Sequence, residues 1–273
     1  MPIVAVTSPD DTRLLAYHAV SDPELAEREG LFVAEGRLVV RRLLATPSLV
    51  TRSLLLTPPA YEGLADVLTG RPEVTVFLAS QDVMNGVAGF NIHRGCLALA
   101  ERPAPRTWQD VASEATRLVV IEQVGDADNI GSAFRCAVAF GSGGVLLGPS
   151  CADPLYRKAI RTSMAATLAV PFAQARPWPD VLTALASAGW HVIGLTPRAD
   201  EPPLWEAAAG AHRSRTALVF GHEGDGLTDA ALRACTHLAR IPMAPGVDSL
   251  NVGVSVGVAL YEISRHPYAE TES

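Results

Sequence analysis

Three short polar segments of this 273-residue chain each follow a run of apolar residues. They are residues 122–135 (EQVGDADNIGSAFR), 220–227 (FGHEGDGL) and 243–251 (MAPGVDSLN). Their asparagine, arginine, glutamate and serine side chains can bind oxyanions, orient a neighbouring group or cap a helix. None of the segments contains the G-x-G-x-x-G or G-x-x-x-x-G-K-[ST] pattern of a phosphate-binding loop.

Residues 253–257 (GVSVG) match the G-x-S-x-G pattern of a hydrolase nucleophile. That pattern needs a strand, a sharp turn and a helix, whereas this serine lies within one apolar run. Residues 252–262 fit either an alternating strand or a two-faced helix. We predict a helix that begins at Leu250 and is capped by Ser249. Glycines four residues apart would let another backbone approach closely, which favours a packing face over a hydrolase site.

Regular elements must hold these segments in place, and the chain after residue 116 alternates between short apolar runs and amphipathic stretches. This alternation predicts an α/β fold, with a mostly parallel sheet and helices on both faces. Ligands bind such sheets beyond the carboxyl ends of the strands, where the three polar segments fall. The predicted strands are 117–122, 145–147, 168–171, 190–195, 217–220 and 238–241, and the predicted helices are 129–140, 155–164, 180–188 and 228–234.

The sequence before residue 116 predicts a separate unit. Residues 1–100 have the pattern of a small α/β domain, and residues 101–115, which are interrupted by prolines, predict a linker to a second domain over 116–273. A predicted helix in the first domain carries three arginines on one side, Arg37, Arg41 and Arg42. This side is either solvated or in contact with phosphates, because the planar guanidinium group suits phosphate oxygens.

Composition excludes several classes of protein. The net charge of −7 argues against a protein that coats nucleic acid non-specifically, although it allows a local basic patch. No apolar run reaches the roughly 18 residues of a membrane helix. The four cysteines form no C-x-x-C pair and the seven histidines are dispersed. We therefore expect reduced thiols in the core, no metal site, no membrane association and a cytoplasmic location.

The three polar segments, in this order and at these separations, closely resemble the signature motifs of the SpoU (TrmH-like) ribose 2′-O-methyltransferases. NIGSAFR, which contains Asn129 and Arg135, resembles the first motif. The glycine-rich stretch 221–226 (GHEGDG) resembles the second, and IPM at 241–243 with SLN at 249–251 resembles the third. Three separated motifs agree on residue types that composition alone does not favour.

The likeness extends over nearly the whole chain. Residues 153–172 resemble a further segment of the family, with Ala165 where the family usually has glycine. Residues 25–100 resemble, less specifically, the small substrate-binding domain that often precedes the catalytic domain. The resemblance implies a trefoil-knotted C-terminal domain that acts as a homodimer, holds S-adenosylmethionine in the knot and needs no metal.

The implied reaction is methyl transfer to a ribose 2′-hydroxyl of RNA. The N-terminal domain resembles the form found in rRNA modifiers, so rRNA is expected as the substrate and partner, with tRNA as the alternative. A noncatalytic RNA-binding protein with the same fold is a second alternative. The intact motif residues argue against that alternative.

The resemblance also implies a catalytic set, Asn129, Arg135, Glu223, Ser249 and Asn251. Arg135 matches the family's catalytic arginine. Because arginine stays protonated in proteins, we expect it to anchor a phosphate and stabilise the forming alkoxide, and the alternative is a salt bridge to Glu122 or Glu223. Helix capping remains an alternative for the two asparagines, and loop stabilisation for Glu223.

The donor-binding set that the resemblance implies is Phe220, Gly221, Ile241, Met243 and Leu250. Main-chain hydrogen bonds and apolar contacts of these residues would clamp the adenine and methionine parts of the donor. Gly221 would let the backbone approach the ligand closely. The alternative for Ile241 and Leu250 is core packing alone.

Overall fold

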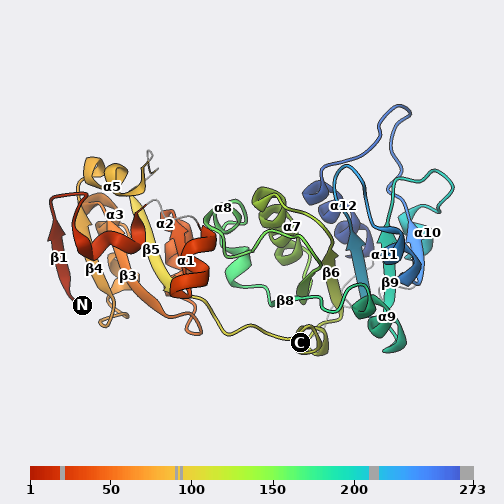
Figure 1. Cartoon of the computed structure of the whole chain (residues 1–273), viewed down its shortest axis with the longest axis horizontal. Coiled ribbons are helices and arrows are strands. Elements are labelled where there is room, and N and C mark those ends of the chain that lie inside the picture. Colours follow the sequence, from red (N-terminus) through yellow and green to blue (C-terminus); the bar gives the residue numbers. More distant parts are fainter. Residues whose placement is uncertain (19–21, 90–91, 93–94, 209–214, 265–273) are drawn as a thin grey trace, which may run out of the picture. The chain divides into compact units, whose positions relative to one another are not determined.

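The computed structural model of the chain describes all residues except 19–21, 90–91, 93–94, 209–214 and 265–273 (Figure 1). The chain divides into two compact units. The first comprises Met1–Ala104 and Pro154–Leu168, and the second comprises Pro105–Asp153 and Ala169–Ser273. Among the described residues, no helix has both the length and the apolar character needed to cross a membrane.

The first unit contains a five-stranded sheet in the order β1-β4-β3-β5-β2. The first three strands in this order run parallel to one another, and β5 runs antiparallel to both of its neighbours. Its elements in chain order are β1 (Ile3–Val6), the 3₁₀ helix η1 (Thr12–Tyr17), α1 (Asp22–Glu29), β2 (Leu31–Glu35), α2 (Arg37–Leu44), β3 (Thr51–Leu56), α3 (Pro58–Glu62), α4 (Ala65–Leu68), β4 (Thr75–Ala79), α5 (Gln81–Ala88) and β5 (Cys96–Glu101).

Residues 154–168, which the sequence assigned to the second domain, belong to the first unit. They form α8 (Arg157–Thr162) and the 3₁₀ helix η2 (Ala166–Leu168), and α8 packs against β2. Glu35 at the end of β2 is only 4% exposed, and its carboxylate lies 3.8 Å from Arg157 Nε and 3.5 Å from Arg161 Nη1. A carboxylate removed from water is costly unless cations lie nearby. The two arginines of α8, more than 100 residues later in the chain, provide them.

The second unit is built on a six-stranded sheet in the order β11-β9-β10-β6-β7-β8 with every strand pair parallel. The mostly parallel α/β sheet expected from the alternation is therefore confirmed. Its elements are α6 (Trp108–Ser113), β6 (Arg117–Ile121), α7 (Ala127–Ala139), β7 (Gly144–Leu147), β8 (Phe172–Gln174), α9 (Asp180–Ser187), β9 (His191–Leu195), α10 (Leu204–Ala207), β10 (Thr216–Phe220), α11 (Asp229–Ala234), β11 (His237–Ala239) and α12 (Val252–Ser264).

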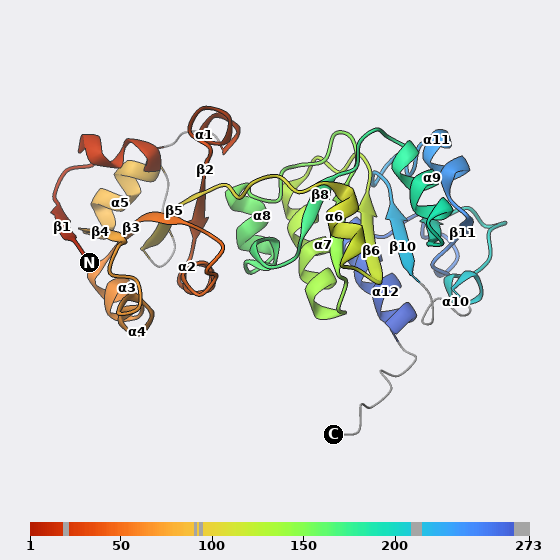
Figure 2. The ribbon, with the colours of Figure 1, turned by 90° about the horizontal axis from the view of Figure 1, so that it is seen from below.

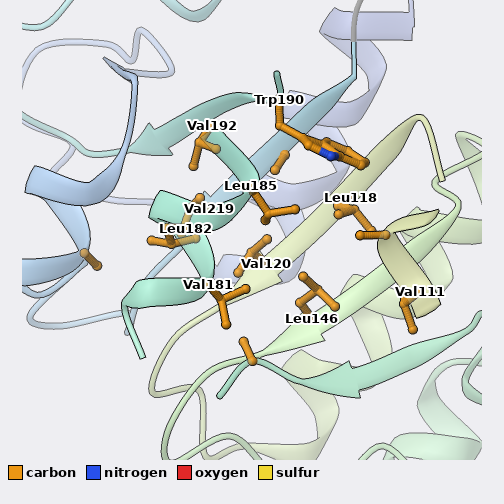
Figure 3. Packing of buried hydrophobic residues seen from close by; sticks show 14 of the residues in the cluster. Val111, Leu118, Val120, Leu146, Val181, Leu182, Leu185, Trp190, Val192 and Val219 are labelled. Carbon is orange, nitrogen blue, oxygen red and sulfur yellow. The ribbon is translucent and has the colours of Figure 1, made fainter. Parts of the chain in front are cut away.

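Helices cover both faces of this sheet, as Figure 2 shows for α9 and α11 on one side of β10 and α12 on the other. Alternate residues of each strand point to opposite faces, so Leu118 and Val120 of β6 face one layer of helices and Val119 and Ile121 face the other. The first layer packs α6, α9 and α11 on the strands (Figure 3). Its central side chains, Leu118, Val120, Leu146, Val181, Leu182, Leu185, Val192 and Val219, are at most 1% exposed.

The elements that differ from the sequence prediction include α6, β8 and α10, and no helix was predicted at α10. The predicted linker contains α6, whose N-terminus has a capping box in which Thr107 and Asp110 bond each other's backbone N–H groups. The strand predicted at 168–171 lies instead at β8, Phe172–Gln174, because residues 166–168 form η2. Pro103 and Pro105 interrupt the pattern just before α6, and the apolar run 168–171 that predicted a strand comes immediately before β8.

The predicted helix at the C-terminal end of the described chain is confirmed as α12, and it lies beside α7 (Figure 1). A Cβ atom on Gly253 would lie 2.5 Å from Ser132 Cβ, and one on Gly257 would lie 3.1 Å from Cys136 Sγ. The two glycines therefore permit the close approach of α7. Ser255 lies inside α12, so the strand–turn–helix that a hydrolase nucleophile requires is absent at 253–257.

Candidate functional site

A cavity of about 390 Å³ opens at the carboxyl edge of the second sheet. Its walls come from the loops that follow β9, β10 and β11 and from the first turn of α12. All strands of the sheet are parallel, so these loops meet at one edge, as the sequence pattern predicts. The five expected donor-binding residues all line the cavity: Phe220, Gly221, Ile241, Met243 and Leu250.

The apolar residues of this set differ in burial. Phe220 is 2% exposed at the end of β10, whereas Ile241 and Leu250 are half-buried. Their exposed surface faces a cavity, so core packing alone does not account for them. Leu195 at the end of β9 and the loop residues Thr196, Pro197 and Arg198 add to the cavity wall. No motif in the sequence marks these four residues, and their position at the end of a strand is the signal that could have found them.

Gly221 begins a tight hairpin in the loop between β10 and α11. The backbone N–H of His222 donates to Gly226 O at 3.1 Å, and the N–H of Gly226 donates back to His222 O at 3.0 Å. A Cβ on Gly221 would lie 2.2 Å from the carbonyl carbon of Gly226. The geometry therefore requires glycine for closure of the hairpin itself, a reason that differs from the close approach of a ligand expected from the sequence.

Three of the expected catalytic side chains form one hydrogen-bonded cluster beside the cavity. Asn129 Nδ2 donates to Glu223 Oε1 at 3.0 Å. Asn251 Nδ2 donates to the same oxygen at 2.8 Å and to Asn129 Oδ1 at 2.8 Å. The backbone N–H of Val252 lies 3.3 Å from Glu223 Oε1. The cluster joins the start of α7, the loop after β10 and the start of α12.

The cap of α12 differs from the prediction. Asn251 Oδ1 accepts from the backbone N–H groups of Gly253 at 2.9 Å and Val254 at 3.3 Å, and the helix begins at Val252. The cap is therefore Asn251, and Ser249 is not the cap. Ser249 is exposed and lines the cavity. The capping alternative for Asn251 thus holds together with its place in the cluster, since its oxygen caps the helix while its NH₂ group serves Glu223.

Comparison of the sequence with models of protein families identifies the family of this chain. The family model described as the SpoU rRNA Methylase family matches residues 116–261. The chain belongs to this family.

The relatives of this SpoU-family chain agree with the match. It is 42% identical over 265 residues to an uncharacterised tRNA/rRNA methyltransferase of Mycobacterium bovis, covering 95% of this chain and 91% of that one. Among solved structures, an AdoMet-bound rRNA methyltransferase from Sinorhizobium meliloti is 25% identical with a TM-score of 0.81, covering 97% of this chain and 98% of that one. An RNA 2′-O ribose methyltransferase is 25% identical with a TM-score of 0.75, covering 95% and 98%.

Arg135, the arginine of the first SpoU-like motif, lies apart from the cluster. It is exposed on α7, six residues beyond Asn129, which places it about 9 Å further along the helix axis. Within the described chain its guanidinium forms no hydrogen bond or ion pair. The alternative of a salt bridge to Glu122 or Glu223 is therefore not seen, because both carboxylates bind other groups.

The three arginines of α2 in the first unit are held differently from one another. Arg41 binds the Asp66 carboxylate at 2.5 and 3.0 Å and Gly63 O at 2.7 Å, and this contact lowers the pKa of Asp66. Arg42 Nη1 donates to Met164 O at 2.5 Å, which leaves its charge unneutralised by that contact. Arg37 is exposed. The structure therefore does not present these arginines as one uniformly solvated face.

Proposed function

We propose that this chain transfers a methyl group from S-adenosylmethionine to a ribose 2′-hydroxyl of rRNA in the cytoplasm. The observation that carries the proposal is the cluster of Asn129, Glu223 and Asn251 beside a cavity whose walls contain all five expected donor-binding residues. Membership of the SpoU family, the AdoMet-bound relative and the 2′-O ribose methyltransferase relative support this combination of donor and acceptor.

The charge of the cavity suits a cationic donor. S-adenosylmethionine supplies a methyl group on a positively charged sulfur. Glu223 forms no ion pair within the described chain, and Asp225 and Asp248 also line the cavity, so its field favours a cation. Arg198 lines another part of the wall, and its guanidinium lies 3.9 Å from the Asp229 carboxylate at the surface. Such an exposed pair can exchange partners, so Arg198 would turn to the carboxylate of the donor. We assign Phe220, Ile241, Met243 and Leu250 to contacts with its apolar parts.

The chain's own residues would act on the acceptor by orientation and charge. We assign Asn129, Glu223 and Asn251 to holding the start of α7 and α12 so that hydroxyl and methyl carbon can be in line, which is a large entropic contribution to such a reaction. Ser249, exposed at the cavity, is available to the ribose. Arg135 would anchor the neighbouring phosphate and stabilise the alkoxide as the proton leaves to solvent, since arginine itself does not accept it.

We propose a homodimer that buries the outer faces of α7 and α12. Large apolar side chains are exposed there: Val138 is 50% exposed, Val254 51%, Val258 40% and Tyr261 57%. Exposed apolar patches on otherwise folded surfaces commonly mark interfaces. Arg135 projects from the same helix as Val138, so this association would let the arginine of one copy serve the cavity of the other. We also propose that the stretch between β11 and α12 forms the trefoil knot of the family.

We propose that the first unit recognises RNA. Its α2 and α8 carry Arg37, Arg42, Arg157, Lys158 and Arg161, of which Arg157 and Arg161 share the single buried carboxylate of Glu35, although the chain as a whole is negatively charged. Local positive charge is what an acidic protein needs to contact a polyanion. We propose that the linker predicted at 101–115 joins this unit to the methyltransferase domain, with its α6 packed in the core of the second unit.

The proposal is tested by incubating the full chain with tritiated S-adenosylmethionine and, separately, with total rRNA and total tRNA. We expect label in rRNA that is recovered, after complete digestion, as a 2′-O-methylated nucleoside. Label in tRNA alone would reassign the substrate, and label on a base would contradict ribose transfer. Donor binding without transfer to either RNA would favour the noncatalytic alternative.

A further inference from the structure

Glu122 is a fully buried carboxylate that the proposed mechanism does not use. It follows β6 directly, is 0% exposed and lies at the carboxyl edge of the sheet. Its Oε1 accepts from Trp178 Nε1 at 2.7 Å and from Thr228 Oγ1 at 2.8 Å, and its Oε2 accepts from the backbone N–H of Thr228 at 2.9 Å. No ion pair neutralises it within the described part of the chain. A buried charge without a cation is costly and is retained only when its hydrogen bonds are fully used.

These hydrogen bonds hold both ends of one loop. The loop leaves the sheet after Phe220 and enters α11 at Thr228. The backbone N–H of Glu122 donates to Phe220 O at 2.8 Å, and its carboxylate binds Thr228 through both the backbone and the hydroxyl. Thr228 Oγ1 also accepts from the N–H of Ala231, which caps α11. Glu122 therefore binds the two residues that flank the 221–227 loop, Phe220 and Thr228.

The loop that Glu122 holds carries most of one wall of the proposed donor cavity. Residues 221–227 all line the cavity. The same loop carries Glu223, which forms the proposed catalytic cluster with Asn129 and Asn251. A shift of Thr228 would therefore move the cavity wall and the cluster together.

We infer that Glu122 is a positioning residue that sets the donor-binding conformation of the 221–227 loop through Thr228 and Trp178. A carboxylate suits this position because Thr228 presents two donors and Trp178 a third, and a carboxylate oxygen accepts without offering a donor. In a glutamine, an NH₂ group would replace one of the two oxygens. It would face either the backbone N–H of Thr228 or the two donors at Oε1, Trp178 Nε1 and the Thr228 hydroxyl, so a donor would meet a donor. The inference rests on the proposed donor site and adds a residue that touches neither donor nor RNA.

The test compares donor affinity with global stability in the full-length protein. Glu122→Gln keeps the side-chain volume, and we expect it to weaken S-adenosylmethionine binding by about tenfold, measured by titration calorimetry, because one buried donor loses its acceptor. Leu118→Ala is the matched control, since Leu118 is 0% exposed and lies near the start of β6, the strand that Glu122 follows. We expect that control to lower the melting temperature with little change in donor affinity.

A second pair of variants covers the case in which Glu122→Gln does not fold. Thr228→Ser keeps the hydroxyl that donates to Glu122, whereas Thr228→Val removes it. We expect the serine variant to bind donor nearly as the wild type does and the valine variant to bind it several-fold more weakly. Trp178→Phe removes a single N–H donor and should have the smallest effect of the set.

Hydrogen exchange of the backbone amides of residues 221–228 distinguishes a local effect on the loop from a general loss of stability. Faster exchange confined to this loop in Glu122→Gln, before global unfolding, supports the inference. Equal loss of donor affinity in Glu122→Gln and Leu118→Ala at equal loss of melting temperature would overturn it, as would wild-type affinity in Glu122→Gln. Failure of the wild-type protein to bind the donor would instead contradict the proposed function.

Discussion

The carboxyl edge of the second sheet and the helix α2 of the first unit both carry the polar residues of a proposed site, but they hold them differently. At the sheet edge, Glu223 is bound by Asn129 and Asn251, which lie 94 and 28 residues away in sequence. On α2, Arg41 is paired with Asp66 at the surface and Arg42 donates to a carbonyl. A cluster assembled from distant segments has its geometry fixed by the fold, whereas a surface arginine keeps the freedom to exchange partners.

Arg135 belongs by sequence to the first region but resembles the second in its structure. It shares a helix with Asn129, yet it is exposed and within the described chain forms no ion pair. One motif can therefore contain a residue whose partners within the described chain fix its side chain, such as Asn129, and a residue without such partners there, such as Arg135. For Arg135 we propose RNA phosphate as the partner, bound in the proposed homodimer.

The largest expected effect is that of removing the Arg135 side chain, which tests whether this exposed residue acts in catalysis. We expect Arg135→Ala to lower methyl transfer by about a hundredfold or more, because charge stabilisation in the transition state is lost. Donor binding should remain near that of the wild type. Arg135→Lys should also be severely impaired, because lysine lacks the planar fork. Single-turnover transfer from labelled donor measures both, and near wild-type turnover by Arg135→Ala would show that the assigned catalytic arginine is wrong.

A second prediction contrasts two glycines of one loop. Gly221→Ala should weaken donor binding by about tenfold or more, because its Cβ would meet backbone atoms of Gly226 that cannot move aside without opening the hairpin. Gly224→Ala should have a much smaller effect, since its Cβ would lie 3.4 Å from the His222 ring, an ordinary contact. Calorimetric titration with S-adenosylmethionine decides, and equal losses would refute the special role of Gly221.

A third prediction separates the two functions of Asn251. Asn251→Asp keeps an oxygen that can cap α12 but replaces the NH₂ group by a carboxylate facing Glu223. Like charges at this distance repel, so we expect about tenfold slower transfer at neutral pH with the helix retained. Circular dichroism and transfer rate together measure this. Unchanged transfer would mean that the cluster is dispensable and that Asn251 is only a cap.

The fourth and smallest prediction concerns the arginines of α2. Arg42→Glu should weaken RNA binding severalfold, and the plot of log affinity against log salt should become shallower by about 0.7 to 0.9 for each phosphate that the variant no longer neutralises. Arg41→Glu should act mainly on stability, because it places a negative charge beside Asp66. Filter binding over a range of salt concentrations and thermal melts distinguish them. Identical RNA affinity and salt slope for Arg42→Glu and the wild type would indicate a merely solvated arginine.

Local signals in the sequence were sufficient for part of the site. Most strands and helices after residue 116 follow from periodicity, with β8 and α10 as exceptions. The polar segments fall at the carboxyl edge because parallel strands end there. The place of Asn129 and Asn251 at the starts of two helices could be anticipated from their residue type. Leu195 to Arg198 could not, because a short loop after a strand carries no signal until its neighbours are known.

Periodicity and residue type in the sequence were enough to predict the α/β alternation, the three polar segments, the small-residue face of α12 and the likeness to the SpoU family. Which side chains meet could be read only from the folded chain. It joined Glu223 to both asparagines, left Arg135 exposed, brought α8 to Glu35 in the first unit and placed Glu122 under Thr228. The physical reason is that periodicity and capping are set by neighbours along the chain, whereas the partner of a buried charge is set by packing between segments far apart in sequence.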